Sequence, residues 1–228
     1  SMRNRFPEMQ FSCTIGFGAD AWKQLFPEQG NPKELKTFET IKGAKYTAVS
    51  TPGDILLHIR AKQMGLCFEF ASIIDEKLKG VVDSIDETHG FRYMDGKAII
   101  GFVDGTENPA VDENPYHFAV IGDEDPDFIG GSYVFVQKYI HDMTAWNSLP
   151  VEAQEKVIGR HKYNDVELSD EEKPQNAHNA VTNIGDDLKI VRANMPFANT
   201  SKGEYGTYFI GYASTCLLYT SPSPRDCS

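Results

Sequence analysis

The clearest structural signal in the chain is a helical periodicity between residues 63 and 82. Apolar side chains recur there at the spacing of one helix face, at Leu66, Phe70, Ile73, Ile74, Leu78 and Val81. Short apolar runs predict strands at residues 10–15, 46–50, 55–59, 82–93, 133–139, 189–195 and 207–212, with further helices at 21–26 and 146–158. Because strands and helices do not alternate regularly, the pattern predicts an α+β fold in which helices cover antiparallel sheets.

Charge and composition argue against several classes of protein. The formal net charge is −11 and no basic run exceeds two residues, whereas nucleic-acid binding needs clustered lysine and arginine. No apolar stretch approaches the length of about 18 residues that a membrane span needs, so we expect no membrane partner. The four cysteines have neither zinc-site nor disulfide-framework spacing, and we expect buried or incidental thiols.

The strongest local motif is GFVDGTENP, at residues 101–109. Two apolar residues lead to Asp104, and the turn-forming residues that follow place its carboxylate where a strand meets a loop. Such a carboxylate can perform acid–base chemistry, or it can simply close an Asx turn or cap a helix. A calcium loop is a third interpretation, since acidic residues follow at 112, 113 and 123–125, but they lack the regular ligand spacing.

A second group of candidate residues lies later in the chain. His178 ends the polar segment KPQNAH, and Arg192 and Asn194 form an R-x-N pattern. None of the six histidines belongs to an HExxH pattern or has a histidine four positions away. A single histidine can be the axial ligand of a haem, although most are ordinary surface or core residues. The residue pattern alone therefore leaves the role of His178 open.

The order of the motifs resembles that of the dye-decolourising peroxidases, most closely the compact bacterial B-type. The similarity covers residues 9–213. It rests on IGFGADAW (15–22), STPGDILLHIRA (50–61), GFVDGTENP (101–109), GGSYVFVQKYIHDM (130–143), IGR (158–160), KPQNAH (173–178), IVRANMPF (190–197) and GTYFIGYA (206–213).

This resemblance implies two ferredoxin-like halves, each with an antiparallel sheet and packed helices. We expect an incomplete first half at residues 1–97, a haem-binding half at 98–214 and a non-native tail at 215–228. Family members typically begin earlier and continue further, into a segment with the acidic partner of the proximal histidine. His178 is therefore expected to lack that partner here, and a haem-deficient fragment remains an alternative.

The resemblance also implies haem b as the cofactor and assigns roles to five residues. His178 matches the proximal iron ligand, and Asp104 matches the distal acid–base carboxylate. Arg192 matches the distal arginine, which also contacts the cofactor, and Asn194 matches a neighbouring amide. Arg160 is expected to contact a haem propionate.

The implied activity is the oxidation of phenolic, dye-like or other organic reductants by hydrogen peroxide. The full-length parent is expected to be a homo-oligomer and, by default, cytoplasmic. A haem-handling or carrier protein with incidental peroxidase activity is an alternative that needs His178 but neither Asp104 nor Arg192. An acidic calcium-binding module without haem is another.

Overall fold

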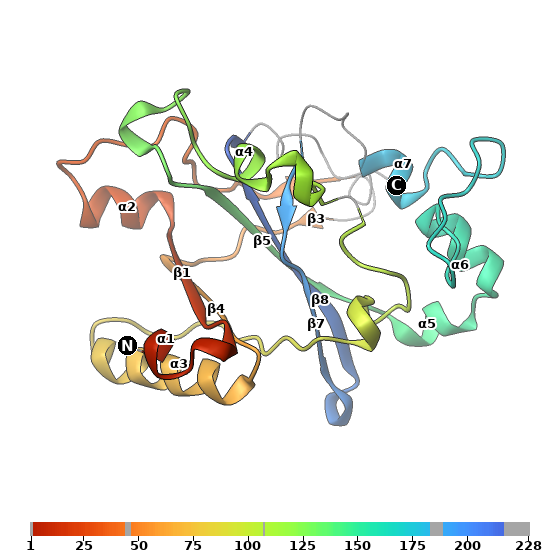
Figure 1. Ribbon diagram of the computed structural model, residues 1–228, viewed down its shortest axis with the longest axis horizontal. Coiled ribbons are helices and arrows are strands. Elements are labelled where there is room, and N and C mark those ends of the chain that lie inside the picture. Colours follow the sequence, from red (N-terminus) through yellow and green to blue (C-terminus); the bar gives the residue numbers. More distant parts are fainter. Residues whose placement is uncertain (1, 44–46, 107, 183–188, 217–228) are drawn as a thin grey trace. The chain divides into compact units, whose positions relative to one another are not determined.

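The computed structural model describes residues 2–43, 47–106, 108–182 and 189–216, and the chain divides into two compact units (Figure 1). Unit 1 comprises residues 1–31, 35–38 and 50–87, and unit 2 comprises residues 32–34, 39–49 and 88–228. Within the described residues, no helix is both long and apolar enough to cross a membrane.

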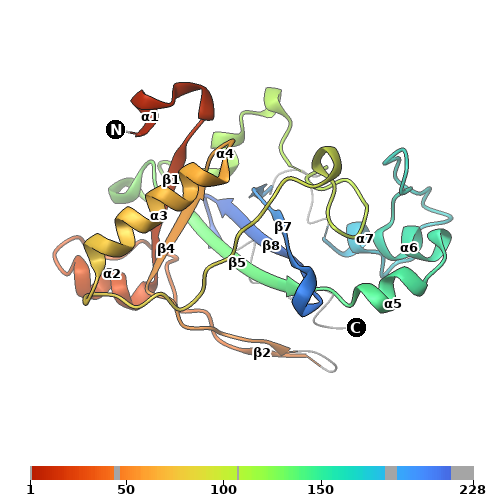
Figure 2. The same cartoon turned by 90° about the horizontal axis from the view of Figure 1, so that it is seen from below.

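Unit 1 is built on one antiparallel strand pair. Its elements are α1 (Met2–Arg5), the 3₁₀ helix η1 (Pro7–Met9), β1 (Ser12–Phe17), α2 (Ala19–Leu25), β4 (Ile55–Arg60) and α3 (Met64–Leu78). β1 and β4 pair along their whole lengths, with Ser12 opposite Arg60. The Phe70 ring of α3 meets Phe11 edge-on, with ring centroids 5.0 Å apart, so the predicted amphipathic helix packs beside this strand pair (Figure 2).

Unit 2 holds the larger sheet and most of the short helices. Its elements are β2 (Ile41–Lys42), β3 (Thr47–Ala48), η2 (Met94–Gly96), η3 (Val111–Glu113), α4 (Pro115–Ala119), η4 (Pro126–Phe128), β5 (Tyr133–Ile140), α5 (Met143–Ser148), α6 (Val151–Ile158), α7 (His178–Thr182), β6 (Val191–Arg192), β7 (Met195–Asn199), η5 (Thr200–Lys202) and β8 (Glu204–Ala213).

β8 is the central strand of this sheet. It pairs antiparallel with β5 on one edge, and with β6 and β7 in succession along the other (Figure 2). Apolar side chains of three of these strands are buried, among them Tyr133, Phe197 and Ile210, so the core of unit 2 lies against the sheet. The predicted combination of antiparallel sheets with packed helices, an α+β fold, is confirmed.

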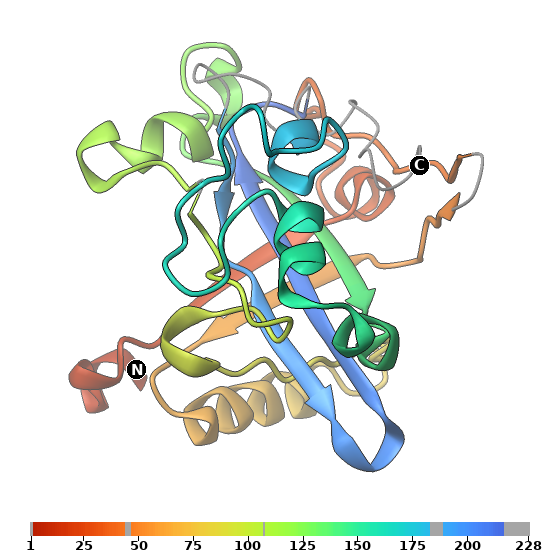
Figure 3. The same cartoon turned by 90° about the vertical axis from the view of Figure 1, so that its right-hand side faces the viewer.

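The predicted helix at 146–158 is in fact two helices. α5 ends at Ser148 and α6 begins at Val151, with Pro150 as its N-cap. Proline lacks a backbone N–H and restricts the residue before it, so a helix cannot continue through this position without cost. α6 ends at Ile158 with Gly159 as its C-cap, and α7 lies beside it (Figure 3).

The strand predicted at 82–93 is wrong. Within the described residues this segment forms no strand: Val82 makes an isolated bridge with Lys79, and the Phe91 N–H donates one hydrogen bond to the Pro196 carbonyl of β7 over 3.0 Å. Its apolar side chains are exposed, with Val81 just before it at 79% and Ile85 at 65%. One backbone hydrogen bond does not make a strand, so the local alternation of polar and apolar residues is not enough to produce one here.

The remaining elements agree with prediction to different degrees. The strand predicted at 189–195 is interrupted and appears as β6 and β7, and the strand at 46–50 is reduced to β3, with Tyr46 outside the described residues. The other predicted strands and helices are present with small shifts of their ends. Of the predicted tail at 215–228, residues from 217 onward lie outside the described part of the chain.

Candidate active site

Asp104 lies in a turn that is held by backbone hydrogen bonds. Its N–H donates to the carbonyl of Gly96 over 3.1 Å, and just upstream the N–H of Ala98 donates to the carbonyl of Phe102 over 2.8 Å. Gly101 closes this turn with a φ of +93°, and a Cβ there would come within 2.8 Å of the Lys162 side chain. The GFVD segment therefore reaches Asp104 through a fixed hairpin-like turn.

An aromatic pair, Phe102 and Trp146, packs at the same turn. Phe102 is 3% exposed, and its ring meets that of Trp146 edge-on, with centroids 6.1 Å apart. The indole N–H of Trp146 donates to the carbonyl of Ile100 over 3.0 Å. Trp146 thus connects α5 to the turn that precedes Asp104, which is a packing role.

Asn194 links Asp104 to the sheet. β6 and β7 pair with β8 in one continuous register, and the Ala193 N–H donates to the Ile210 carbonyl over 2.9 Å. The Ile210 N–H, however, donates to Oδ1 of Asn194 over 3.2 Å. Because this bond fixes Oδ1 as the acceptor, Nδ2 is the donor in the 3.2 Å contact with Oδ1 of Asp104.

Asn108 makes a second connection between the same turn and the same sheet edge. Its Nδ2 donates to the carbonyl of Arg192 over 3.0 Å, and its Oδ1 accepts the Arg192 N–H over 2.8 Å. The sequence analysis did not single out Asn108. The available signal was its place four residues after Asp104 in GFVDGTENP, although spacing alone does not reveal a partner 84 residues away.

His178 is the first residue of α7, a five-residue helix. Thr182 donates its hydroxyl to the His178 carbonyl over 2.7 Å and closes this single turn. The next residue, Asn179, donates from Nδ2 to the carbonyl of Gly159 over 3.1 Å and to Glu167 over 3.0 Å. The start of α7 is therefore tied to the end of α6.

Arg160 follows Gly159 directly and is held by local carboxylates. Its Nε donates to Oδ1 of Asp165 over 3.0 Å, and its Nη1 lies 3.7 Å from Glu167. The side chain is 18% exposed. Arg160 thus lies on the segment that Asn179 joins to His178, while its contact with a haem propionate remains a prediction.

The five predicted residues fall into two groups within unit 2. Asp104 bonds to Asn194 directly, and Arg192 is linked to the same turn through its backbone bonds to Asn108. His178 and Arg160 are joined through the contact of Asn179 with Gly159. One group offers a carboxylate, a guanidinium and an amide, and the other offers an imidazole and a second guanidinium. The sequence predicted these residues but not the bonds between them.

The acidic segment at 112–125 uses its carboxylates in local structure. Glu113 accepts from Lys189 and from the Ala110 N–H, and these hydrogen bonds lower the pKa of its carboxyl. Asp125 accepts the Lys33 N–H over 2.8 Å. Across the described ranges, no three or more His, Cys, Asp or Glu side chains form a group suited to a metal ion, so the calcium alternative gains no support.

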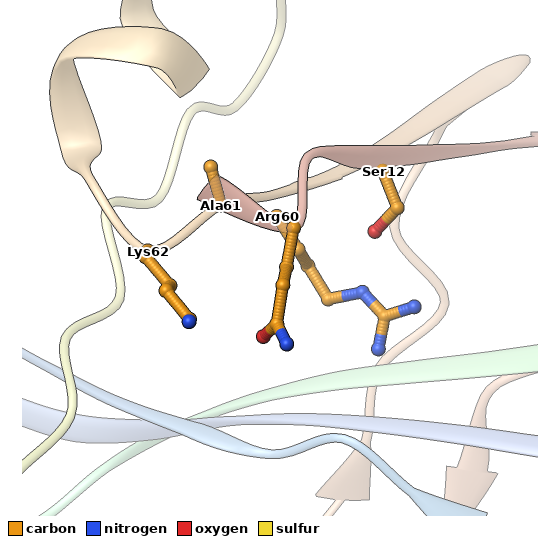
Figure 4. Close-up of a pocket in the computed structure, with 5 residues that line it drawn as sticks. Ser12, Arg60, Ala61 and Lys62 are labelled. Atoms are coloured by element: carbon orange, nitrogen blue, oxygen red, sulfur yellow. The ribbon is translucent and has the colours of Figure 1, made fainter. Parts of the chain in front are cut away.

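A shallow pocket of about 330 Å³ lies in unit 1 (Figure 4). Its lining is polar and basic, formed by Gln10, Ser12, Arg60, Ala61 and Lys62. None of the predicted site residues contributes to it.

Comparison with known proteins gives a consistent result. The family model "Dyp-type peroxidase, N-terminal" matches residues 1–92, and "Dyp-type peroxidase, C-terminal" matches residues 95–221. The dye-decolorizing peroxidase of Rhodococcus erythropolis is 51% identical over 215 residues, which cover 92% of this chain and 62% of that protein. The chain spans 58% to 64% of the length of the curated relatives it matches.

Solved structures agree with the sequence relatives. The crystal structure of a dye-decolorizing peroxidase from Bacteroides thetaiotaomicron is 87% identical, with a TM-score of 0.93, over 96% of this chain and 71% of that one. A Rhodococcus jostii DypB variant in complex with heme is 47% identical, with a TM-score of 0.88, over 92% of this chain and 68% of that one. The predicted family is confirmed: the chain belongs to the Dyp-type peroxidases.

Proposed function

We propose that this chain is part of a haem-dependent peroxidase that uses hydrogen peroxide to oxidise phenolic, dye-like or other organic reductants. The observation that carries the proposal is a pair of links between one turn and one sheet edge: Asn194 donates to Asp104, and Asn108 of the same turn bonds the backbone of Arg192. The turn thus anchors a residue with a proton acceptor, and the sheet edge a residue with a permanent cation, the two kinds of group that the cleavage of peroxide requires.

The residues present fit haem b. An imidazole such as His178 can ligate iron, and guanidinium groups such as Arg192 and Arg160 can pair with propionates. The R. jostii DypB variant, a relative of this chain, is described in complex with heme. When bound, haem b would supply the redox-active iron that peroxide oxidises. We assign His178 as the iron ligand.

Asp104 acts first as a base and then as an acid in this proposal. It accepts a proton from one oxygen of hydrogen peroxide and returns that proton to the other oxygen. The second oxygen then leaves as water. Asn194 donates to Oδ1 of Asp104. We assign the transferred proton to the other carboxylate oxygen, Oδ2.

Arg192 has a different task, because its guanidinium cannot give up a proton at ordinary pH. It supplies a fixed positive charge where negative charge grows as the O–O bond breaks. A haem carrier would need His178 but would need neither Arg192 nor Asp104. No specific observation favours the carrier.

We also propose a domain division, an oligomeric state and a location for the parent protein. The two halves at 1–97 and 98–214, a homo-oligomeric parent and a cytoplasmic location are predictions that follow from the family resemblance. The reductant would be a small organic molecule.

The test is peroxide-dependent oxidation of a phenol, such as 2-methoxyphenol, by the hemin-loaded chain. Asp104→Asn should lower the rate by about 10²- to 10⁴-fold, because the amide cannot accept the peroxide proton. Asp127→Asn removes an equal charge from an exposed residue of η4 and should leave the rate unchanged. A wild-type rate in Asp104→Asn, with equal hemin loading, would overturn the assignment.

A further inference from the structure

The backbone of Arg192 faces away from β8. In an antiparallel pair, successive residues direct their N–H and C=O groups alternately toward and away from the neighbouring strand. Ala193 bonds to Ile210 of β8, so Arg192, which lies opposite Gly211, directs its groups to the outer side of β6. An edge strand leaves such groups without a partner strand.

Asn108 takes the place of that partner strand. One primary amide accepts the Arg192 N–H at 2.8 Å and donates to the Arg192 carbonyl at 3.0 Å, as a residue of an adjacent strand would do. An amide is suited to this because it carries a donor and an acceptor side by side. β6 is only two residues long, and this clamp bonds both backbone groups of its second residue.

The same turn fixes where the amide of Asn108 lies. The Asn108 N–H donates to the Gly105 carbonyl over 3.0 Å, and Gly105 has a φ of +84°. Asp104 precedes this glycine and accepts from Asn194. The turn is therefore tied to the sheet edge at two places, once through Asp104 and once through Asn108.

We propose that Asn108 is a positioning residue for the reaction with peroxide. Its side-chain amide clamps the backbone of Arg192 and thereby sets the position of the arginine relative to Asp104. This inference rests on the roles proposed above for those two residues, since Asn108 acts through Arg192.

Two substitutions separate the parts of the clamp. Asn108→Asp keeps the shape of the side chain and its hydrogen-bond acceptor. While the new carboxyl group is ionised it has no donor, and its negative charge faces the Arg192 carbonyl. Once protonated, a carboxylic acid again has one donor and one acceptor. The defect should therefore be present at neutral pH and disappear as the pH falls toward about 4. Asn108→Leu loses both bonds at every pH.

Asn147→Asp is the matched control. It makes the same chemical change at an exposed residue of α5. At pH 7, both Asn108 variants should react with peroxide about 10- to 100-fold more slowly than this control, the range expected for a misplaced catalytic group. As the pH is lowered, the ratio of Asn108→Asp to the control should approach one, and the ratio for Asn108→Leu should not.

Amide hydrogen exchange of Arg192 tests the clamp without hemin. In Asn108→Leu the Arg192 N–H loses its acceptor, and its exchange should be at least about tenfold faster than in the control. Asn108→Asp retains the acceptor and should exchange at a rate close to the control. If Asn108→Leu does not fold, the proposal is tested by how the ratio of the Asn108→Asp rate to the control rate changes with pH.

Unchanged Arg192 exchange in Asn108→Leu would overturn the proposal, as would parallel pH profiles of Asn108→Asp and the control. Hemin loading is measured separately by titration of the Soret band. Failure of the wild-type chain to load hemin would count against the proposed function, and the exchange experiment would still decide whether Asn108 holds Arg192.

Discussion

Gly159→Ala should destabilise unit 2 and weaken the tie between the segments that carry Arg160 and His178. Gly159 ends α6 with a φ of +90°, and a Cβ there would lie 1.8 Å from Oδ1 of Asn179. Asn179 would have to move, and it would give up its hydrogen bonds to Gly159 and Glu167.

The magnitude follows from a comparison with Gly203→Ala. Gly203 has a similar left-handed conformation, with a φ of +64°, but nothing lies within 4 Å of its Cβ position. Gly203→Ala should cost only the backbone strain, about 1–2 kcal/mol. Gly159→Ala adds two lost hydrogen bonds at about 1 kcal/mol each, for a total of about 3–4 kcal/mol.

The assay is urea unfolding followed by tryptophan fluorescence in a Trp22→Phe background, so that Trp146 reports on unit 2 alone. A second arm places Gly159→Ala in an Asn179→Ala background. The clash is absent there, and the added cost should fall to that of Gly203→Ala. Equal losses for Gly159→Ala and Gly203→Ala in the presence of Asn179 would refute the reasoning.

Three further predictions concern the two units. Arg192→Leu should slow the reaction with peroxide more than Asn194→Leu does, because only Arg192→Leu removes a full positive charge. Stopped-flow mixing of the hemin-loaded variants with peroxide measures both rates, and a slower reaction in Asn194→Leu would contradict this prediction. Asn194→Leu should lower the unfolding free energy of unit 2 by about 1–3 kcal/mol, since the Ile210 N–H loses its acceptor; an unchanged urea midpoint would count against that bond. Burial, assisted by Arg60, lowers the pKa of His58 to about 4 from 6.5, so the unfolded chain takes up the proton first. Unit 1 should therefore lose stability as the pH falls from 6.5 to about 4, and His58→Gln, compared by urea unfolding at several pH values, should lose less.

Local sequence patterns predicted the elements whose apolar periodicity is complete within the segment. The periodicity at 63–82 gave the position of α3 to within a few residues, and the apolar runs at 133–139 and 207–212 correspond to β5 and β8. The segment 82–93 has a similar pattern, but in the described residues it forms no strand, because strand formation also depends on ladder pairing that sequence periodicity does not report. At 146–158 the helical prediction did not take account of Pro150, which separates α5 from α6.

The site residues were predicted through the family resemblance, because their chemistry depends on distant contacts. The bond between Asp104 and Asn194 spans 90 residues, and that between Asn108 and Arg192 spans 84. Nothing in the local sequence marks Asn108 as the partner of an edge strand, because the need for a partner arises only when β6 lies at the edge of the sheet. Likewise, the reason for glycine at 159 is the side chain of Asn179, on another helix.

The most direct test of the central claim is the absorption spectrum of the hemin-reconstituted chain, recorded for the wild type and His178→Ala before and after one equivalent of hydrogen peroxide. We predict a ferric Soret band that depends on His178 and changes when peroxide is added. A band of equal position and intensity in His178→Ala, or a wild-type spectrum that peroxide leaves unchanged, would contradict the assignment of this chain as a haem peroxidase with His178 as its iron ligand.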